Sequence, residues 1–294
     1  MREFDRYHPI CNAVYFLLAL VFGCLFFHPT ALILLFAASL AHYGVINGFA
    51  RGCKRLLLTL PAFLLAAAVN PLFSHGGVTI LFYLPSGNPM TKESIYYGLC
   101  FSGMLMGVLN VFSCFRAVMT SDKMLYLTGR AFPTLSLVFS MSLRFVPELI
   151  EQTKETADAQ KCIGRFSDKG LFSKIRSAFA VLSAVTTRCL ENSADIADSM
   201  KARGYGLPGR SSFSIFTFHK RDGFALLFLL ITGGVTALGA FCGVFSATFY
   251  PSFKTAPFSA MTVLCYTAYV LFLFFPVLSE LLGVIRWRCM KSGI

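Results

Sequence analysis

Apolar residues along the chain form six long runs, and the segment between the fourth and fifth runs is more polar. The runs cover residues 10–27, 30–47, 56–73, 95–115, 223–246 and 257–285. A helix that crosses a bilayer needs about 20 mostly apolar residues. The pattern therefore predicts an all-α membrane protein of about six spanning helices, with four spans in residues 1–115, a segment of cytoplasmic helices at 116–222 and two spans in residues 223–294.

Within the middle segment, the spacing of apolar residues predicts two long helices. The sequence ELIEQTKETADAQKCIG follows Pro147 and is typical of a helix that begins near this proline and stops at Gly164. The second helix is predicted at about 174–203, and its apolar residues form one stripe that would be its buried face. The stripe consists of Ile175, Phe179, Leu182, Val185, Cys189, Ile196 and Met200.

A shorter apolar stretch, AFPTLSLVFSMSLRFV, occupies residues 131–146. If it crossed the membrane, the basic loops on its two flanks would face opposite sides. We therefore expect a helix that is buried against other spans or lies at the membrane interface.

The basic residues are distributed unevenly between the two predicted sides of the membrane. The 294 residues are 56% hydrophobic and carry a net charge of +12. Of the 26 Lys and Arg, only Lys92 and Lys254 fall in the connections 74–94 and 247–256. Because basic loops remain inside, both termini and all of 116–222 are predicted to be cytoplasmic. Anionic lipid or an acidic partner accounts for the positive charge without nucleic acid.

Three glycines near the end of the second predicted helix have the spacing of a dinucleotide-binding loop. Gly204, Gly206 and Gly209 spell G-x-G-x-x-G. A phosphate loop of this type follows a strand and opens a helix, whereas here a helix leads into the glycines. We therefore interpret Gly204 as the residue that ends this helix. Arg203 then either complements the helix dipole or projects as a cation for a partner's carboxylate, and the two roles are compatible.

The middle segment resembles the coupling region of the transmembrane (T) component of energy-coupling factor transporters. That family has an Ala-Arg-Gly triplet at the end of each of two cytoplasmic helices. ADIADSMKARGYG, at 194–206, matches the second motif at Ala202, Arg203 and Gly204. SLRFVPEL at 142–149 and FDRYHP at 4–9 are also typical of the family.

The first motif departs from the family pattern. AQKCIG stands at 159–164 in place of the family's AQKARG, so that Cys162 and Ile163 replace the alanine and the arginine of the triplet and Gly164 is kept. Lys161 and Arg165 are neighbouring cations that could substitute for the missing arginine. We therefore expect the two helix ends to contact their partners unequally.

The resemblance implies a multi-pass subunit of the bacterial plasma membrane that does not catalyse a reaction. Its implied partners are two ABC-type ATPase subunits, which bind ATP and Mg²⁺, and a separate membrane (S) subunit that binds a vitamin or a metal ion. This chain is expected to bind no cofactor itself. It contains no G-x-x-x-x-G-K-[ST] sequence.

Two other classes of function are weaker alternatives. A stand-alone carrier usually has ionisable residues at mid-membrane depth, whereas here Glu280 and His42 lie near the ends of spans. A membrane-embedded enzyme needs a nucleophile, a carboxylate pair or a histidine cluster, and the five histidines are scattered. Small-residue pairs at Gly103/Gly107 and Gly239/Gly243 favour helix packing within the chain, or else a surface for a partner.

Overall fold

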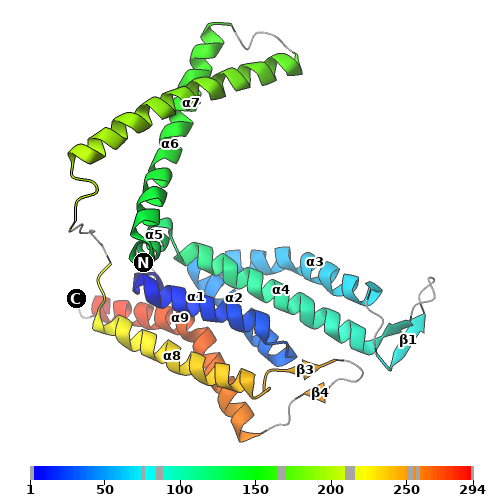
Figure 1. Ribbon diagram of the computed structural model, residues 1–294. Helices are drawn as coiled ribbons and strands as arrows, with labels where there is room; N and C mark the ends of the chain where they lie inside the picture. The colour runs from blue at the N-terminus through cyan, green and yellow to red at the C-terminus, as the bar shows by residue number, and fades with distance from the viewer. Residues whose placement is uncertain are drawn as a thin grey trace. The chain divides into compact units, whose positions relative to one another are not determined.

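The computed structural model describes residues 3–73, 77–83, 89–164, 170–208, 216–249, 254–255 and 259–292. Its helices, after a short 3₁₀ turn (η1, Phe4–Arg6), are α1 (Pro9–Leu25), α2 (Pro29–Asn47), α3 (Phe49–Phe73), α4 (Lys92–Val118), α5 (Ser121–Ala131), α6 (Pro133–Cys162), α7 (Leu171–Ala202), α8 (Lys220–Phe241) and α9 (Ala260–Ser292). Two small antiparallel hairpins pair β1 (Ile80–Tyr83) with β2 (Pro89–Thr91) and β3 (Ala247–Thr248) with β4 (Lys254–Thr255). The prediction of an all-α membrane protein is confirmed (Figure 1).

Five helices are long and apolar enough to cross a membrane. They are α2, the 50–73 part of α3, α4, α8 and the 260–285 part of α9. The remaining predicted span, α1, is an apolar helix of only 17 residues, at the lower limit of about 17–25 residues for a spanning helix. The helices thus occur where the sequence predicts spans, and α1 is the shortest of them.

The chain divides into two compact units. One contains residues 1–124 and 216–294, and the other contains residues 125–215. The first unit contains all the candidate spans, and we call it the membrane unit. The second contains α6 and α7, and we call it the helical arm.

Within the membrane unit, α4 packs against both α2 and α3, while α9 packs against α2 and α8. Glycines allow some of these close contacts. A Cβ atom on Gly107 of α4 would lie 3.0 Å from Leu35 Cδ2, and one on Gly239 of α8 would lie 2.6 Å from Cys265 Sγ. These two glycines therefore serve packing within the chain, as the sequence suggested. Gly243 instead follows the end of α8 with a φ of +75°.

The N-terminal residues are held inside the membrane unit. Phe4 is almost fully buried and its ring contacts those of Tyr15 and His42. The Glu280 carboxylate accepts hydrogen bonds from the backbone N–H groups of Glu3 (2.9 Å) and Phe4 (3.0 Å). Glu280 and His42 thus have structural partners, which accounts for two ionisable residues in otherwise apolar helices.

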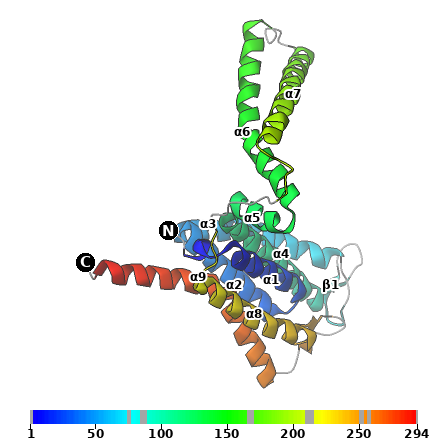
Figure 2. The ribbon, with the colours of Figure 1, turned by 60° about the vertical axis from the view of Figure 1, so that its left-hand side comes forward.

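The helical arm consists largely of α6 and α7, which pack against each other and cross (Figures 1 and 2). Gln152 is the buried residue of α6. On α7 the buried residues Ser177, Val181 and Val185 are spaced four apart, so that they share one face. Because α7 packs against α6, we interpret this buried face as the contact between the two helices.

Two details of the predicted arm are wrong. Pro147 does not begin a helix, because α6 starts at Pro133 and runs through Pro147 to Cys162. The apolar stretch 131–146 and the first predicted helix thus largely form a single helix, and α6 is not among the candidate spans. Its Leu135 and Val138 are about half exposed, and its placement at a membrane interface stays a prediction.

The predicted buried stripe of α7 is also wrong in its first half. Ile175, Phe179 and Leu182 are 53%, 67% and 59% exposed. Val185 of the predicted stripe is buried, as expected, but the other buried residues, Ser177 and Val181, were not in the stripe. Because each residue advances the helix by about 100°, these residues lie farther round the helix than Ile175 and Phe179.

Candidate functional site

The ends of α6 and α7 have the same backbone hydrogen bonds. At the end of α6, the Ile163 N–H donates to the Ala159 carbonyl (3.2 Å) and the Gly164 N–H to the Lys161 carbonyl (2.9 Å). At the end of α7, the N–H of Arg203 donates to the Ser199 carbonyl (3.1 Å), and that of Gly204 to the Lys201 carbonyl (2.9 Å). Each helix therefore closes its last turn by the same pair of bonds.

A glycine in the left-handed conformation ends both helices. Gly164 has a φ of +85° and Gly204 a φ of +86°. Other residues adopt this conformation at a cost, because their Cβ atom crowds the following carbonyl oxygen. Both glycines thus end their helices as the sequence predicted.

The two ends also carry the same ion pair. Lys161 Nζ lies 2.8 Å from Asp158 Oδ1, and Lys201 Nζ lies 3.3 Å from Asp198 Oδ1. Both pairs are exposed and join residues three apart on one face of the helix. Each lysine also lies in the last turn, where the helix dipole favours a cation.

Together these features define a repeated pattern, D-x-x-K-x-x-G, at 158–164 and again at 198–204. Every position in the second copy lies 40 residues after its equivalent in the first. The two glycines and Lys161 were predicted from the sequence, whereas the pairing of each lysine with an aspartate was not. The constant spacing of these residues was the signal that could have found them.

The equivalent positions before the glycines carry different side chains. Cys162 corresponds to Ala202, and Ile163 to Arg203. All four residues are exposed, Ile163 by 74%. The Arg203 guanidinium makes no hydrogen bond or ion pair with any residue that the structure describes. Arg165, the neighbouring cation that could replace the missing arginine, lies outside the described residues.

Beyond Gly204 the chain folds into a compact turn. The Tyr205 N–H donates to the Met200 carbonyl (3.0 Å), and the Leu207 N–H to the Gly204 carbonyl (3.2 Å). Tyr205 and Leu207 are 49% and 69% exposed. The end of α7 therefore presents a guanidinium and two apolar side chains on a short, hydrogen-bonded projection.

This geometry is unlike that of a phosphate loop. The residues before Gly204 belong to the 32-residue helix α7 and not to a strand. The end of a helix carries partial negative charge, which disfavours phosphate. Gly209, the last glycine of the G-x-G-x-x-G spacing, lies outside the described residues. Across the described ranges, no three His, Cys, Asp or Glu residues are grouped as metal ligands.

What the end of α7 can do chemically follows from its exposed arginine. A guanidinium donates hydrogen bonds in a planar fork that fits a carboxylate. Held one residue beyond a long helix, it can transmit a push or pull along the helix axis. The end of α6 has the same backbone conformation, with the apolar side chain of Ile163 in place of the guanidinium.

The family model of CbiQ, described as cobalt transport protein, matches residues 8–215 of the chain. This range includes both helix ends and most of the membrane unit. It covers more than half of the 294 residues, so the family assignment rests on the body of the chain and not on one motif.

Several similar proteins carry the name EcfT, and they match this chain over different shares of its length. The energy-coupling factor transporter transmembrane protein EcfT of Bacillus selenitireducens is 27% identical over 70% of this chain and 80% of the relative. A protein of Listeria monocytogenes named EcfT 1 is 28% identical over 65% of this chain and 74% of its own length. EcfT of Lactobacillus helveticus is 31% identical, but the match spans only 37% of that protein.

The match to the family model and the long matches to EcfT proteins agree on the family that the sequence resembles. The resemblance inferred from the sequence is confirmed. The chain belongs to the CbiQ family of cobalt transport proteins, as a transmembrane component of the energy-coupling factor transporter type.

Proposed function

We propose that this chain is the coupling subunit of an ATP-driven importer. In this proposal two ABC-type ATPase subunits bind the ends of α6 and α7. ATP-driven movement of these subunits passes through the helical arm to a separate membrane subunit, which captures a vitamin or a metal ion. The observation that carries the proposal is the pair of equivalent, exposed helix ends at 158–164 and 198–204.

The equivalence of the two ends supports attachment of two similar partners. Two copies of one fold, such as two ABC-type ATPases, would each meet the same helix end, the same lysine and the same turn at a glycine. ATP and Mg²⁺ are assigned to those partners, and none of the reaction to this chain. A carboxylate in a partner's groove would pair with Arg203.

The difference between the ends supports unequal attachment. Arg203 can form a charge-assisted hydrogen bond, which contributes about 1.5–3 kcal/mol net. Ile163 offers apolar area and no group that orients a carboxylate. We therefore propose that α7 provides the stronger and more specific contact, and that Ala202, Arg203 and Gly204 form the principal motif, while 161–165 forms a weaker one.

The arm is built to transmit force between distant points. At 1.5 Å per residue, α6 and α7 are about 45 Å and 48 Å long. They pack against each other, with Val181 and Val185 of α7 buried, so that movement of one helix end can be transferred to the other helix. Packed helices resist compression because protein interiors are dense.

The exposed apolar side chains of the arm support a further partner. Ile175, Phe179 and Leu182 form one exposed stripe on α7. An exposed stripe of this kind is typical of a surface that binds another apolar surface. We assign it to the substrate-binding membrane subunit, because the ATPases are already assigned to the helix ends.

The proposed orientation places the helix ends in the cytoplasm, where ATP is present. One native and one introduced cysteine can test it. Cys162 ends α6, and Thr248 of β3 lies in the predicted exterior connection 247–256; both are exposed. In a chain whose only cysteine comes from Thr248→Cys, an impermeant maleimide should label intact cells. In a chain that keeps only Cys162, labelling should require permeabilised cells, and labelling without it would contradict the orientation.

The direct test of the function is purification of the chain with candidate ABC-type ATPases encoded in the same genome. The intact chain should retain the ATPases and stimulate ATP hydrolysis in the complex. Arg203→Glu should lose at least one ATPase subunit. The matched control is Arg188→Glu, because Arg188 is an exposed arginine of the same helix away from its end.

Two results would contradict the proposal. One is hydrolysis of ATP by the chain purified alone. The other is equal retention of both ATPases by the Arg203→Glu and Arg188→Glu variants, because Arg203 would then be an ordinary exposed cation.

A further inference from the structure

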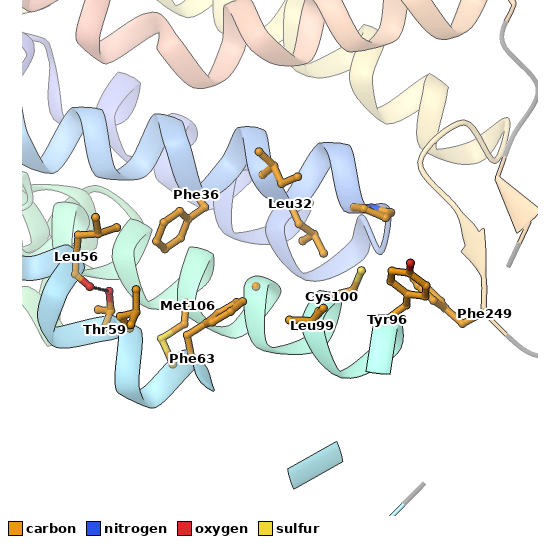
Figure 3. A pocket seen from close by; sticks show the side chains of 14 residues that line it. Leu32, Phe36, Leu56, Thr59, Phe63, Tyr96, Leu99, Cys100, Met106 and Phe249 are labelled. Carbon is orange, nitrogen blue, oxygen red and sulfur yellow. Dashed lines mark hydrogen bonds between the residues drawn. The ribbon is translucent and has the colours of Figure 1, made fainter. Parts of the chain in front are cut away.

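The membrane unit contains an apolar slot of about 630 Å³ that is unrelated to the helix ends. It is bounded by α2, α3 and α4 and by Phe249 beside β3 (Figure 3). Its lining residues include Leu32 and Phe36 of α2, Phe63 of α3 and Cys100 of α4. All three helices contain candidate spans, so the slot lies within the part of the chain expected in the bilayer.

The slot lies between α2 and α3 and against α4. Near the loop that joins them, α2 and α3 approach closely, because a Cβ atom on Gly52 of α3 would lie 3.2 Å from the Gly44 Cα of α2. Farther along, the buried side chains of Leu32, Cys100 and Met106 form the floor.

One end of the slot is closed and its sides are open. At the closed end, Leu32 and Cys100 pack with Phe249 in a buried cluster. Ile33 and Leu60 on the rim are 67% and 48% exposed. The slot is therefore continuous with the surface of the spanning helices that faces lipid hydrocarbon.

The dimensions of the slot fit an extended hydrocarbon chain. Along α4 the lining runs from Tyr96 to Met106, which is about 15 Å at 1.5 Å per residue. That length is about half of the ~30 Å hydrocarbon core, and so equals the depth of one leaflet. The residues that each helix contributes are spaced mostly three or four apart, so that they form a stripe along its face.

The chemistry of the lining also favours hydrocarbon. Of the 14 lining residues, all except Thr59 are apolar or aromatic residues, glycine or cysteine. The Thr59 hydroxyl already donates to the Leu56 carbonyl at 3.0 Å. A polar ligand would lose its hydration there without new hydrogen bonds, whereas an alkyl chain loses nothing.

Gly103 leaves the space that such a chain would occupy. A Cβ atom on Gly103 would meet no atom within 4 Å, whereas one on Gly107, one turn farther along α4, would press on Leu35. The two glycines of this pair therefore differ, because Gly107 serves helix packing and Gly103 opens into the slot. Helix packing accounts for only one of them.

We infer that this slot binds one acyl chain of a membrane phospholipid, between α2 and α3 and against α4. The lipid fills space that the protein leaves empty, and its headgroup remains at the membrane surface. The inference concerns the membrane unit alone and does not depend on the proposed ATPase contacts.

The test uses the full-length chain in vesicles of phosphatidylethanolamine and phosphatidylglycerol. A small fraction of the phosphatidylglycerol carries a photoactivatable diazirine on its acyl chain. Labelling should reach Cys100 and Met106, because an inserted chain contacts these buried residues while lipid on the outer surface does not. In mild detergent, native mass spectrometry should find one retained phospholipid per chain.

A filling variant supplies the control. Gly103→Leu places a side chain in the slot and should reduce both floor labelling and retained lipid about tenfold, because several buried methylene groups lose their site. Gly103→Ala should give a smaller loss and is expected to fold readily, because alanine favours helices. Gly234→Leu, at a glycine of α8 that also faces open space, should change neither measurement.

Three results would overturn the inference. The first is floor labelling that is equal in the wild-type chain and both Gly103 variants. The second is a retained adduct whose mass is that of detergent or another adventitious additive only. The third is loss of floor labelling when the partner subunits assemble, because a partner side chain would then occupy the slot.

Discussion

The end of α6 and the end of α7 have the same backbone and present different side chains. Each helix ends on a left-handed glycine, and each carries an Asp–Lys pair in its last turns. At the position before the glycine, α6 has Ile163 and α7 has Arg203. The backbone of the two ends is therefore the same, while at the position before the glycine a guanidinium, which can orient a carboxylate, is present at α7 and an apolar side chain at α6.

This comparison separates two properties that a docking motif usually combines. The glycine and the ion pair determine where the chain turns and how the helix end projects. In the proposed docking, Arg203 requires a carboxylate from its partner. A partner of α6 would then need the same groove without that carboxylate.

The largest expected effect is that of Arg203→Glu on attachment of the ATPase at α7. The substitution removes a bond that contributes about 1.5–3 kcal/mol and adds repulsion from the partner's carboxylate. Binding of that ATPase should weaken by about a hundredfold or more. The measurement is the dissociation constant of the ATPase from the purified membrane subunit, at two salt concentrations.

Ile163→Glu is the matched change at the other end. If the groove at α6 has no carboxylate, this substitution costs only apolar contact and should weaken binding less. Equal losses from the two glutamate variants would remove the chemical difference between the ends.

A smaller effect is expected from the glycines. Gly204→Ala forces a Cβ atom into the left-handed conformation, which costs about 1–2 kcal/mol, and that atom would lie 3.2 Å from Leu207 Cδ1. Gly164→Ala has the same backbone cost but meets no atom within 4 Å. Faster hydrogen exchange in the last turn should therefore appear in both variants and be greater for Gly204→Ala. The reverse order would contradict the extra cost assigned to the contact with Leu207.

Restoring the arginine should sharpen the comparison. Ile163→Arg places a cation at the end of α6, where the helix dipole favours it by about 0.3–1 kcal/mol. We expect the variant to fold as well as the wild-type chain, with a melting temperature that is unchanged or slightly higher. A clear fall in the melting temperature would show that Ile163 has a structural role that its exposure does not indicate.

The smallest effect is expected from the ion pairs. Lys161→Ala and Lys201→Ala each remove an exposed pair of residues three apart, and such pairs contribute about 0.3–0.5 kcal/mol. Both variants should show nearly the same small loss of helix stability, measured by hydrogen exchange. Unequal losses would mean that one lysine has a role beyond its own helix.

The sequence predicted these helix ends better than it predicted the helices themselves. A glycine that directly follows a long helical pattern of apolar and polar residues usually ends the helix. Gly164 and Gly204 could therefore be assigned as helix ends from the local sequence alone. Pro147 was misleading, because proline is tolerated near a helix start but also occurs inside helices when the flanking residues hold the helix together. The choice depends on contacts that a local pattern does not contain.

The faces of α7 could not be assigned from periodicity for a related reason. The predicted stripe included the buried Val185, but it also included the exposed Ile175 and Leu182 and missed the buried Val181. The larger side chains of Ile175 and Leu182 indicated a buried face, whereas the smaller valines are the residues that α7 buries. The slot beside Gly103 also could not be predicted from the sequence, because it depends on how α2, α3 and α4 pack together.

The measurement that tests the account most directly is the retention of each ATPase on purified complexes that carry Arg203→Ala or Ile163→Ala. The account predicts that Arg203→Ala loses most of one ATPase, with binding weakened about tenfold to a hundredfold, and that uptake falls with it. Ile163→Ala should retain both ATPases and most of the uptake. Greater loss from Ile163→Ala than from Arg203→Ala would contradict the unequal roles of the two helix ends.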